Sequence, residues 1–424
     1  MVNLSMPEPS WAYKGWPNRD PGTSLDEVVA EGLNLFSDDF LFPVATISVD
    51  ALDHNISTMA MFSEDNDVSL APHAKTTMSP EIIDRQIASG AWAITAATAS
   101  QARTFRQFGV KRILIAHEVV DPAAVRWIAN ELARYPDMEI MCLVDSIAAV
   151  EAMEQALADV SGQRPVDVLV ELGHADGRTG CRSVDDAVRV GHRVGESERL
   201  RLVGVEGYEG MIPAADDDYS AVDEFLNRVR LTAEQLDGLG HFDGLAEIVL
   251  TAGGSSFPDR VVTMLGAVDE LSKPIRVVIR SGCYVTHDSG MYANSGPFGK
   301  RAPMLNYPPL QAAMTVWSYV VSRPEPDLAI LGFGKRDASF DVGYPKPLFI
   351  RRSGGIEPLD SGSAEVFSLN DQHAYVRVSH DADLAVGDVI GCGISHPCTT
   401  FDKWRAIPLV DSDFDVVGAI RTFF

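Results

Sequence analysis

Hydrophobic and polar positions alternate regularly along residues 43–304. Short apolar, β-prone runs, the first of them VATISV at 44–49, are each followed by a stretch with helical periodicity. Amphipathic helices are expected at 147–158, 184–194 and 221–236. About eight apolar strands that alternate with helices predict a parallel α/β sheet. At this length a closed (β/α)8 barrel of the TIM type is favoured over a doubly wound open sheet.

The pattern changes after about residue 305. Runs such as MTVWSYVVSRP, PLFIRR and HAYVRVS are short strands separated by turn residues, with little helical periodicity. Residues 1–42 are rich in Pro, Gly and acidic residues and carry Trp11 and Trp16. The expected organisation is an N-terminal arm (1–42) that packs on the body or on a second subunit, a barrel (43–304) and a C-terminal all-β domain (305–424).

Composition narrows the class of protein. The chain has 424 residues and a formal net charge of −25, which argues against nucleic acid or an anionic membrane as its main partner. No stretch approaches the ~20 consecutive apolar residues of a membrane span, and the first residues lack the pattern of a signal peptide. Five cysteines in a chain of this size form no disulfide framework. A cytoplasmic protein is expected.

One lysine stands where barrel enzymes build their sites. Lys75 lies in APHAKTTMSP, directly after the expected second barrel strand at 68–71, and no acidic residue lies within three positions of it. The C-terminal ends of barrel strands carry the active site in this fold. A lysine in a partly desolvated setting is a good amine for an aldehyde, so Lys75 is a candidate catalytic residue.

The sequence around Lys75 resembles a known family. PHAKTTMSPEI is similar to the PHAK-T-h-K-x-P segment of D-threonine aldolases and D-serine dehydratases, which are alanine racemase-like enzymes. The resemblance continues in order through WAITAA, VLVELGHADGRTG and GYEG, and covers roughly residues 43–420. It implies pyridoxal 5′-phosphate held covalently by Lys75, a small D-amino acid as substrate, and a homodimer.

Two glycine turns are expected to hold the cofactor phosphate. In TAGGSSF, Gly253 and Gly254 let the backbone approach an anion, and Ser255 adds a hydroxyl group. The second turn, RSGCY, resembles the family's R-P-G-x-Y. The resemblance implies that Gly282, Cys283 and Tyr284 also contact the cofactor.

Two further residues are cofactor candidates. Arg178 ends the segment VELGHADGRTG and could pair with substituents of the cofactor ring or with the substrate carboxylate; a salt bridge across the barrel mouth is the alternative. Tyr208 in GYEG occupies the place of a tyrosine-bearing strand end in the family.

A metal site is expected in SHPCTTFDKWR. His396 and Cys398 are two residues apart, which in an extended segment places both side chains on one face. Imidazole and thiolate favour zinc over magnesium or calcium, and two ligands leave positions open for substrate. The resemblance associates His-x-Cys with zinc and D-serine dehydratases, and His-x-Asp with manganese and D-threonine aldolases, so zinc is expected and manganese is the alternative. His373 is a candidate for an outer-shell or acid–base role, and Asp402 for an outer-shell or surface position.

The sequence also departs from the family. Gly332 replaces the aspartate of the family's D-A-G-x-K, and Thr77-Met78-Ser79-Pro80 replaces its H-K-C-P. These changes weaken the inference about the identity of the substrate more than the inference about the cofactor. The expected reaction is β-elimination from a D-3-hydroxy amino acid to a 2-oxo acid and ammonia. The alternatives are aldol cleavage to glycine and an aldehyde, a racemase with Tyr284 as second base, and a non-catalytic barrel that binds pyridoxal phosphate.

Overall fold

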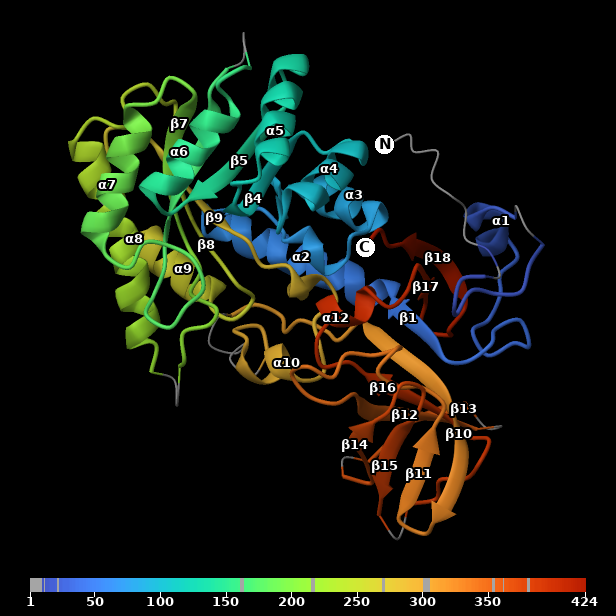
Figure 1. The fold of residues 1–424 in the computed structure, drawn as a ribbon. Coiled ribbons are helices and arrows are strands. Elements are labelled where there is room, and N and C mark those ends of the chain that lie inside the picture. Colours follow the sequence, from blue (N-terminus) through green and yellow to red (C-terminus); the bar gives the residue numbers. More distant parts are fainter. Residues whose placement is uncertain are drawn as a thin grey trace.

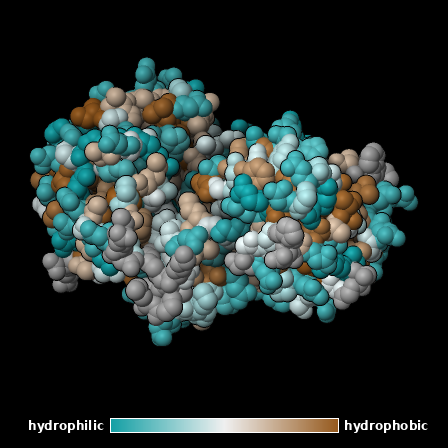
Figure 2. Space-filling view, turned by 90° about the horizontal axis from the view of Figure 1, so that it is seen from below, coloured by the Kyte–Doolittle hydropathy of each residue, from teal (hydrophilic) through white to brown (hydrophobic). Residues whose placement is uncertain are grey.

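The computed structural model has two lobes that meet along one side of the barrel (Figure 1). Seen from below, the surface is waisted between the lobes, and hydrophobic residues are interspersed among hydrophilic ones (Figure 2). The residues that the structure describes are 10, 12–20, 23–160, 164–214, 218–268, 271–299, 306–352, 355–360, 362–379 and 382–424. None of the helices in these ranges combines the length and apolar character needed to cross a lipid bilayer.

The first lobe is an eight-stranded parallel sheet with the strand order β2-β9-β8-β7-β6-β5-β4-β3. The main-chain N–H of Trp92 donates to the carbonyl of Leu70 at 2.8 Å, and an isolated bridge pairs His73 with Thr95, so the two end strands also meet. The expected closed barrel followed by a β domain is therefore confirmed. The barrel strands are β2 (Ser69–Leu70), β3 (Ile94–Ala96), β4 (Arg112–Glu118), β5 (Glu139–Val144), β6 (Val166–Leu172), β7 (Leu200–Gly207), β8 (Ile248–Ala252) and β9 (Ile275–Ile279).

Helices surround the barrel, and most begin at a residue that caps them. Ser48, Ser79, Thr98, Asp121, Ser146 and Ser183 each accept a hydrogen bond from a main-chain N–H of the first turn. These caps end each loop and fix where the next helix starts. The helices are α2 (Val49–Asp65), α3 (Pro80–Ala88), α4 (Ala99–Gln107), α5 (Pro122–Arg134), α6 (Ile147–Ala156), α7 (Val184–Gly195), α8 (Ser220–Gly238) and α9 (Pro258–Leu265).

Alternate strand positions divide the barrel into an inner and an outer core. Leu114, Leu169, Val203, Val249 and Val278 belong to a small buried cluster formed by residues of successive barrel strands. Their sequence neighbours on the same strands pack in the large cluster that includes the helices. This is the two-residue period expected when one sheet face fills the barrel and the other face receives the helices.

The second lobe is a ten-stranded sheet with the main order β13-β12-β16-β10-β1-β17-β18, to which β11, β14 and β15 add a further antiparallel layer. Its strands apart from β1 are β10 (Met314–Glu325), β11 (Leu328–Leu331), β12 (Lys346–Arg352), β13 (Gly355–Pro358), β14 (Ala364–Leu369), β15 (Ala374–Val378), β16 (Val389–Gly393), β17 (Ala406–Val410) and β18 (Val416–Arg421).

Strand β1 (Val44–Ser48) lies in this second sheet. It pairs antiparallel with β10 and parallel with β17, so the expectation that residues 44–49 form the first barrel strand is wrong. The two-residue strand β2 takes that place in the barrel. An apolar strand followed by a helix has the same sequence pattern in either sheet. The spacing of hydrophobic residues does not show which other strand it pairs with. The chain thus starts in the β domain and returns to it after the barrel.

The N-terminal arm packs on the body. Helix α1 (Leu25–Ala30) lies beside β18, and Trp16, which is buried, clusters with Val28, Ala406 and Ala419. Trp11 lies outside the described residues.

Candidate active site and metal centre

The sequence-predicted residues of the barrel follow strands β2, β6, β7, β8 and β9. Lys75 lies in the 3₁₀ turn η1 (Ala74–Thr76) after β2, and Arg178 and Tyr208 follow β6 and β7. Gly253 follows β8, and Gly282 precedes the 3₁₀ turn η2 (Cys283–Val285) after β9. Because the strands are parallel, these positions all lie at the C-terminal end of the barrel.

Lys75 is half-buried, and it makes no hydrogen bond or ion pair to any residue that the structure describes. Burial lowers its pKa, an effect that the neighbouring Cys398 opposes and Arg178 reinforces. Burial also lowers the pKa of the nearby His73 well below its usual value, so that this imidazole is neutral. The Lys75 amine is therefore shifted toward the free base, which is the nucleophilic form.

The two glycine turns lie against each other and against η1. Gly253 has φ of +154°, and a Cβ placed on it would lie 2.7 Å from the main-chain N of Arg280. A Cβ on Gly282 would lie 2.5 Å from the carbonyl oxygen of His73. The N–H of Cys283 donates to the hydroxyl of Ser255 at 3.3 Å. Glycine is thus required for the close approach of the three segments.

Some N–H groups of these turns have partners and others do not. The N–H of Gly254 donates to the buried carboxylate of Glu209 at 2.9 Å. In contrast, the N–H groups of Ser255 and Gly282 donate to none of the described residues. Main-chain N–H groups that have no acceptor within the protein are suited to bind an anion.

Arg178 and Tyr208 contact each other at the barrel mouth. The Arg178 guanidinium lies 4.2 Å from the centre of the Tyr208 ring, and burial raises the pKa of that tyrosine. The side chain of Tyr284 has a different environment. Its hydroxyl receives a hydrogen bond from the side-chain amide of Gln86 at 3.0 Å, and the ring belongs to the large hydrophobic core.

A buried ion pair, which the sequence reasoning missed, lies beneath these residues. Arg280 and Glu206 are each 2% exposed in their side chains and form a salt bridge. Arg280 also donates to the hydroxyl of Thr251 at 2.7 Å. Burial raises the pKa of Glu206 to about 8, and the charge of Arg280 opposes this shift. The sequence offers a local signal, because Glu206 follows the apolar residues Leu202–Val205 and Arg280 follows Val277–Ile279.

His396 and Cys398 reach the barrel from the β domain. Cys398 starts the short helix α12 (Cys398–Phe401), and Pro397 has α-helical angles, so the expectation of an extended segment is wrong. The pair nevertheless lies together, because Cys398 hydrogen-bonds His396 and this contact raises the pKa of the imidazole to about 9. The Cys398 thiol lies 3.3 Å from the hydroxyl of Thr76, the residue after Lys75.

The His396 ring is oriented by a residue that the sequence reasoning missed. Its Nδ1 lies 2.7 Å from Oδ2 of Asp341, which leaves Nε2 for another partner. The loop that carries Asp341 is joined to the same segment by Ser339, whose hydroxyl accepts from the N–H of His396 at 3.0 Å. Since 55 residues separate Asp341 from His396, no local pattern could have linked them.

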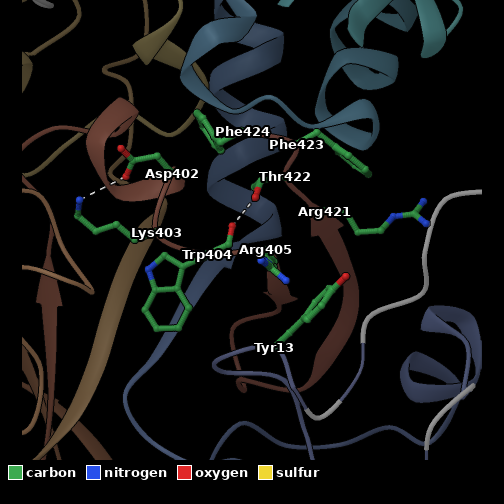
Figure 3. Close-up of a pocket in the computed structure, with 9 residues that line it drawn as sticks. All are labelled: Tyr13, Asp402, Lys403, Trp404, Arg405, Arg421, Thr422, Phe423 and Phe424. Atoms are coloured by element: carbon green, nitrogen blue, oxygen red, sulfur yellow. Dashed lines mark hydrogen bonds and ion pairs between the residues drawn. The ribbon is translucent and has the colours of Figure 1, made fainter.

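Two other predicted positions lie elsewhere. His373 is exposed in the turn between β14 and β15. Asp402 is exposed and pairs with Lys403. Asp402 and Lys403 line a separate cavity, whose volume is about 480 Å³. Figure 3 shows them with other lining residues near the C-terminus, such as Arg421. This cavity contains none of the predicted cofactor or metal residues.

Comparison with known proteins gives matches to both lobes. Residues 47–253 match the N-terminal domain of alanine racemase, and residues 313–410 match a putative serine dehydratase domain. A D-threonine aldolase of Arthrobacter sp is 26% identical over 373 residues, which cover 87% of this chain and 88% of the relative. A D-threo-3-hydroxyaspartate dehydratase of Delftia sp. (strain HT23) is 30% identical over 171 residues, 40% of this chain and 43% of that one.

The fold has solved counterparts as well. The crystal structure of D-threonine aldolase from Filomicrobium marinum matches with a TM-score of 0.74 and 25% identity, over 91% of this chain and 95% of that one. The two domain matches follow each other in the order barrel, then β domain, and the aldolase relatives span both. The protein is an enzyme of the lyase class whose barrel and β domain are similar to those of alanine racemase-like enzymes, D-threonine aldolases among them.

Proposed function

We propose that this chain uses pyridoxal 5′-phosphate and a divalent metal to eliminate water from a D-3-hydroxy amino acid. The enamino acid that results takes up water and yields a 2-oxo acid and ammonia. One observation carries the proposal: the Cys398 thiol lies 3.3 Å from the hydroxyl of Thr76, next to Lys75. A soft metal-ligand pair thereby reaches the lysine that would hold the cofactor. A metal at that place can act on the substrate bound to that cofactor.

The residues present fit pyridoxal phosphate. The N–H groups of Ser255 and Gly282, which have no acceptor among the described residues, and the hydroxyl of Ser255 would hold its phosphate. Lys75 would hold its aldehyde carbon. The Lys75 amine has no competing hydrogen bond among the described residues. The Lys75 amine, whose pKa is lowered by burial, would react with the aldehyde of the cofactor, and the main-chain N–H groups would bind its phosphate.

When bound, the cofactor supplies a conjugated ring that accepts the electron pair released at the substrate Cα. The chain's own residues would then do the rest. Lys75, as a free amine, takes the Cα proton. Arg178, whose guanidinium stacks on Tyr208, binds the substrate carboxylate. The buried Arg280–Glu206 pair fixes the floor of the site.

The donor set also fits a borderline-soft divalent metal such as zinc. Imidazole nitrogen and thiolate sulfur are ligands that zinc prefers, whereas manganese prefers oxygen. Asp341 at 2.7 Å fixes the ring of His396, as carboxylates do for metal-bound histidines. The metal would stabilise the leaving 3-hydroxyl group, which is the reason for preferring elimination.

Aldol cleavage to glycine and an aldehyde is the second candidate, since a D-threonine aldolase is among the relatives that match most of the chain. A racemase would need a second acid–base group, and the Tyr284 hydroxyl proposed for that role is held by Gln86. A non-catalytic barrel would have no use for a thiol–imidazole pair beside Lys75.

Product analysis separates these candidates. The holoenzyme is incubated with D-serine, D-threonine and D-3-hydroxyaspartate, and 2-oxo acid, ammonia, glycine and the enantiomer are measured. Ammonia with a 2-oxo acid from at least one substrate supports the proposal. Glycine as the main product moves the assignment to the aldolase, and the enantiomer alone moves it to a racemase.

We also propose that the enzyme is a homodimer located in a reducing compartment. The five cysteines are free. The resemblance to the alanine racemase-like group implies a dimer in which the β domain of one subunit lies over the barrel mouth of the other. Light scattering at working concentration tests the dimer. A fully active monomer contradicts it.

A further inference from the structure

A third sulfur-bearing side chain lies at the thiol–imidazole pair. The Sγ atom of Cys283 lies 3.5 Å from Sγ of Cys398, and both cysteines are free. One ring nitrogen of His396 and the two sulfur atoms all lie within 4.8 Å of one another. Cys283 comes from the barrel and Cys398 from the β domain, so the contact joins the two lobes.

The sulfur–sulfur distance matches a shared metal. A disulfide needs a separation of about 2.05 Å, so 3.5 Å is far too long for that bond. Two thiolates bound at about 2.3 Å to a tetrahedral zinc stand ~3.8 Å apart, within a few tenths of an ångström of the observed distance. Small movements of two side chains would therefore suffice to place a metal between them.

Charge gives a second argument. The two sulfur atoms share a hydrogen bond, and Cys283 is 6% exposed. If both lost their protons they would repel each other in this buried setting unless a cation lay between them. A divalent cation bound by two thiolates and one neutral imidazole gives a site with no net charge. Such a site is suited to lie beside Lys75 and the guanidinium of Arg178, whose positive charge would otherwise oppose the binding of a dication.

The backbone of Cys283 serves another purpose without conflict. Its N–H lies in the glycine cradle, where it donates to Ser255, while its side chain points to Cys398. A cofactor phosphate at the Ser255 hydroxyl, which the N–H of Cys283 contacts, would therefore leave the sulfur of Cys283 free to bind a metal. In the sequence, Cys283 occupies the variable position of R-P-G-x-Y, and the resemblance implied a cofactor contact for it.

We propose that Cys283 is a third protein ligand of the metal, so that the ion is bound by two thiolates and one imidazole with one coordination position left for substrate. The inference rests on the metal site of the proposed function. It adds that the site is rich in thiolate, which favours zinc strongly over manganese.

X-ray absorption at the zinc edge tests this on the purified holoenzyme, because it counts the sulfur atoms around the metal. The wild type should show two sulfur neighbours at about 2.3 Å. Cys283→Ser, which keeps the side-chain size, should show one, with zinc affinity reduced by at least about 10-fold. Cys142→Ala, which removes a buried thiol in β5, is the control and should leave both values unchanged.

The outcomes separate this inference from the function on which it rests. Zinc bound with one sulfur in the wild type overturns the role of Cys283 and leaves the His396–Cys398 site intact. Two sulfurs that persist in Cys283→Ser also overturn it. A holoenzyme that binds no zinc overturns the metal site itself. The sulfur count of the wild type decides the matter even if Cys283→Ser does not fold.

Discussion

The Nδ1 atom of His396 lies 2.7 Å from a carboxylate oxygen of Asp341, and the other oxygen of that carboxylate accepts a hydrogen bond from Thr399 at 2.9 Å. The carboxylate is therefore held at both oxygens and in turn fixes the plane of the imidazole. Histidines that bind metals have such a partner in most known sites. Neither the loop of Asp341 nor the segment of His396 has a regular pattern that predicts this pairing.

Asp341→Asn should weaken zinc binding about 10–100-fold, because the imidazole loses the charged partner that orients it and increases its basicity. The affinity is measured by competition with a chromophoric chelator. Asp402→Asn is the matched control, since Asp402 lies near the same helix but pairs with Lys403. Equal zinc affinity in wild type and Asp341→Asn would show that the carboxylate has no part in the metal site.

Borohydride reduction of the holoenzyme should attach the cofactor to Lys75 alone, because this is the lysine at the glycine cradle and its amine has no hydrogen-bond partner among the described residues. Peptide mapping by mass spectrometry identifies the labelled lysine. Lys75→Ala should abolish the label. Lys403→Ala should keep it, because that amine is paired with Asp402. A label on any other lysine of the wild type contradicts the assignment.

The rate of cofactor uptake by the apoenzyme should rise with pH and level off below pH 10.5. Only the neutral amine attacks an aldehyde, and burial holds the pKa of Lys75 below that ordinary value. At pH values between the pKa of Lys75 in the folded protein and 10.5, this lysine is protonated in the unfolded chain but not in the folded one. The contribution of Lys75 to the free energy of unfolding therefore increases with pH over this range.

Stopped-flow absorbance measures the uptake rate, with Nα-acetyl-lysine as the unburied reference amine. The enzyme's midpoint should lie at lower pH than that of the reference. Identical midpoints would mean that burial does not act on this amine.

Some features of this fold could be read from local sequence and others could not. The helices at 147–158, 184–194 and 221–236 lie within two residues of α6, α7 and α8 at each end, since their period and their caps are local. The partner of β1 could not be read, because pairing depends on residues 265 or more positions away. The position of Lys75 followed from its motif and the barrel order.

The metal centre shows the same division. The spacing of His396 and Cys398 drew attention to the right segment, although the reason given, an extended backbone, was wrong. Cys283 and Asp341 come from two other segments, 115 and 55 residues from their partners in the site. A sequence motif names the ligands that are close along the chain, and tertiary packing supplies the rest.

Gly282→Ala should lower cofactor affinity at least about 10-fold, because its Cβ would lie 2.5 Å from the carbonyl oxygen of His73 and 2.8 Å from the Thr76 hydroxyl. The neighbours are the main chain and a buried side chain of the turn that carries Lys75, so relief of the clash must move the lysine relative to the phosphate cradle. A shift of about 1 Å in a reacting group costs about 100-fold in rate, and activity should fall further than affinity.

Gly238→Ala is the matched control. It lies at the end of α8, where a Cβ meets no atom within 4 Å, so it should leave cofactor affinity unchanged and slightly stabilise the helix. Affinity is measured by absorbance titration of the apoenzyme with pyridoxal phosphate, and folding by thermal denaturation. A Gly282→Ala variant that binds the cofactor as tightly as Gly238→Ala would show that the close approach of η1 and the β9 turn is not what forms the cradle, and the cofactor would have to be placed elsewhere on the barrel mouth.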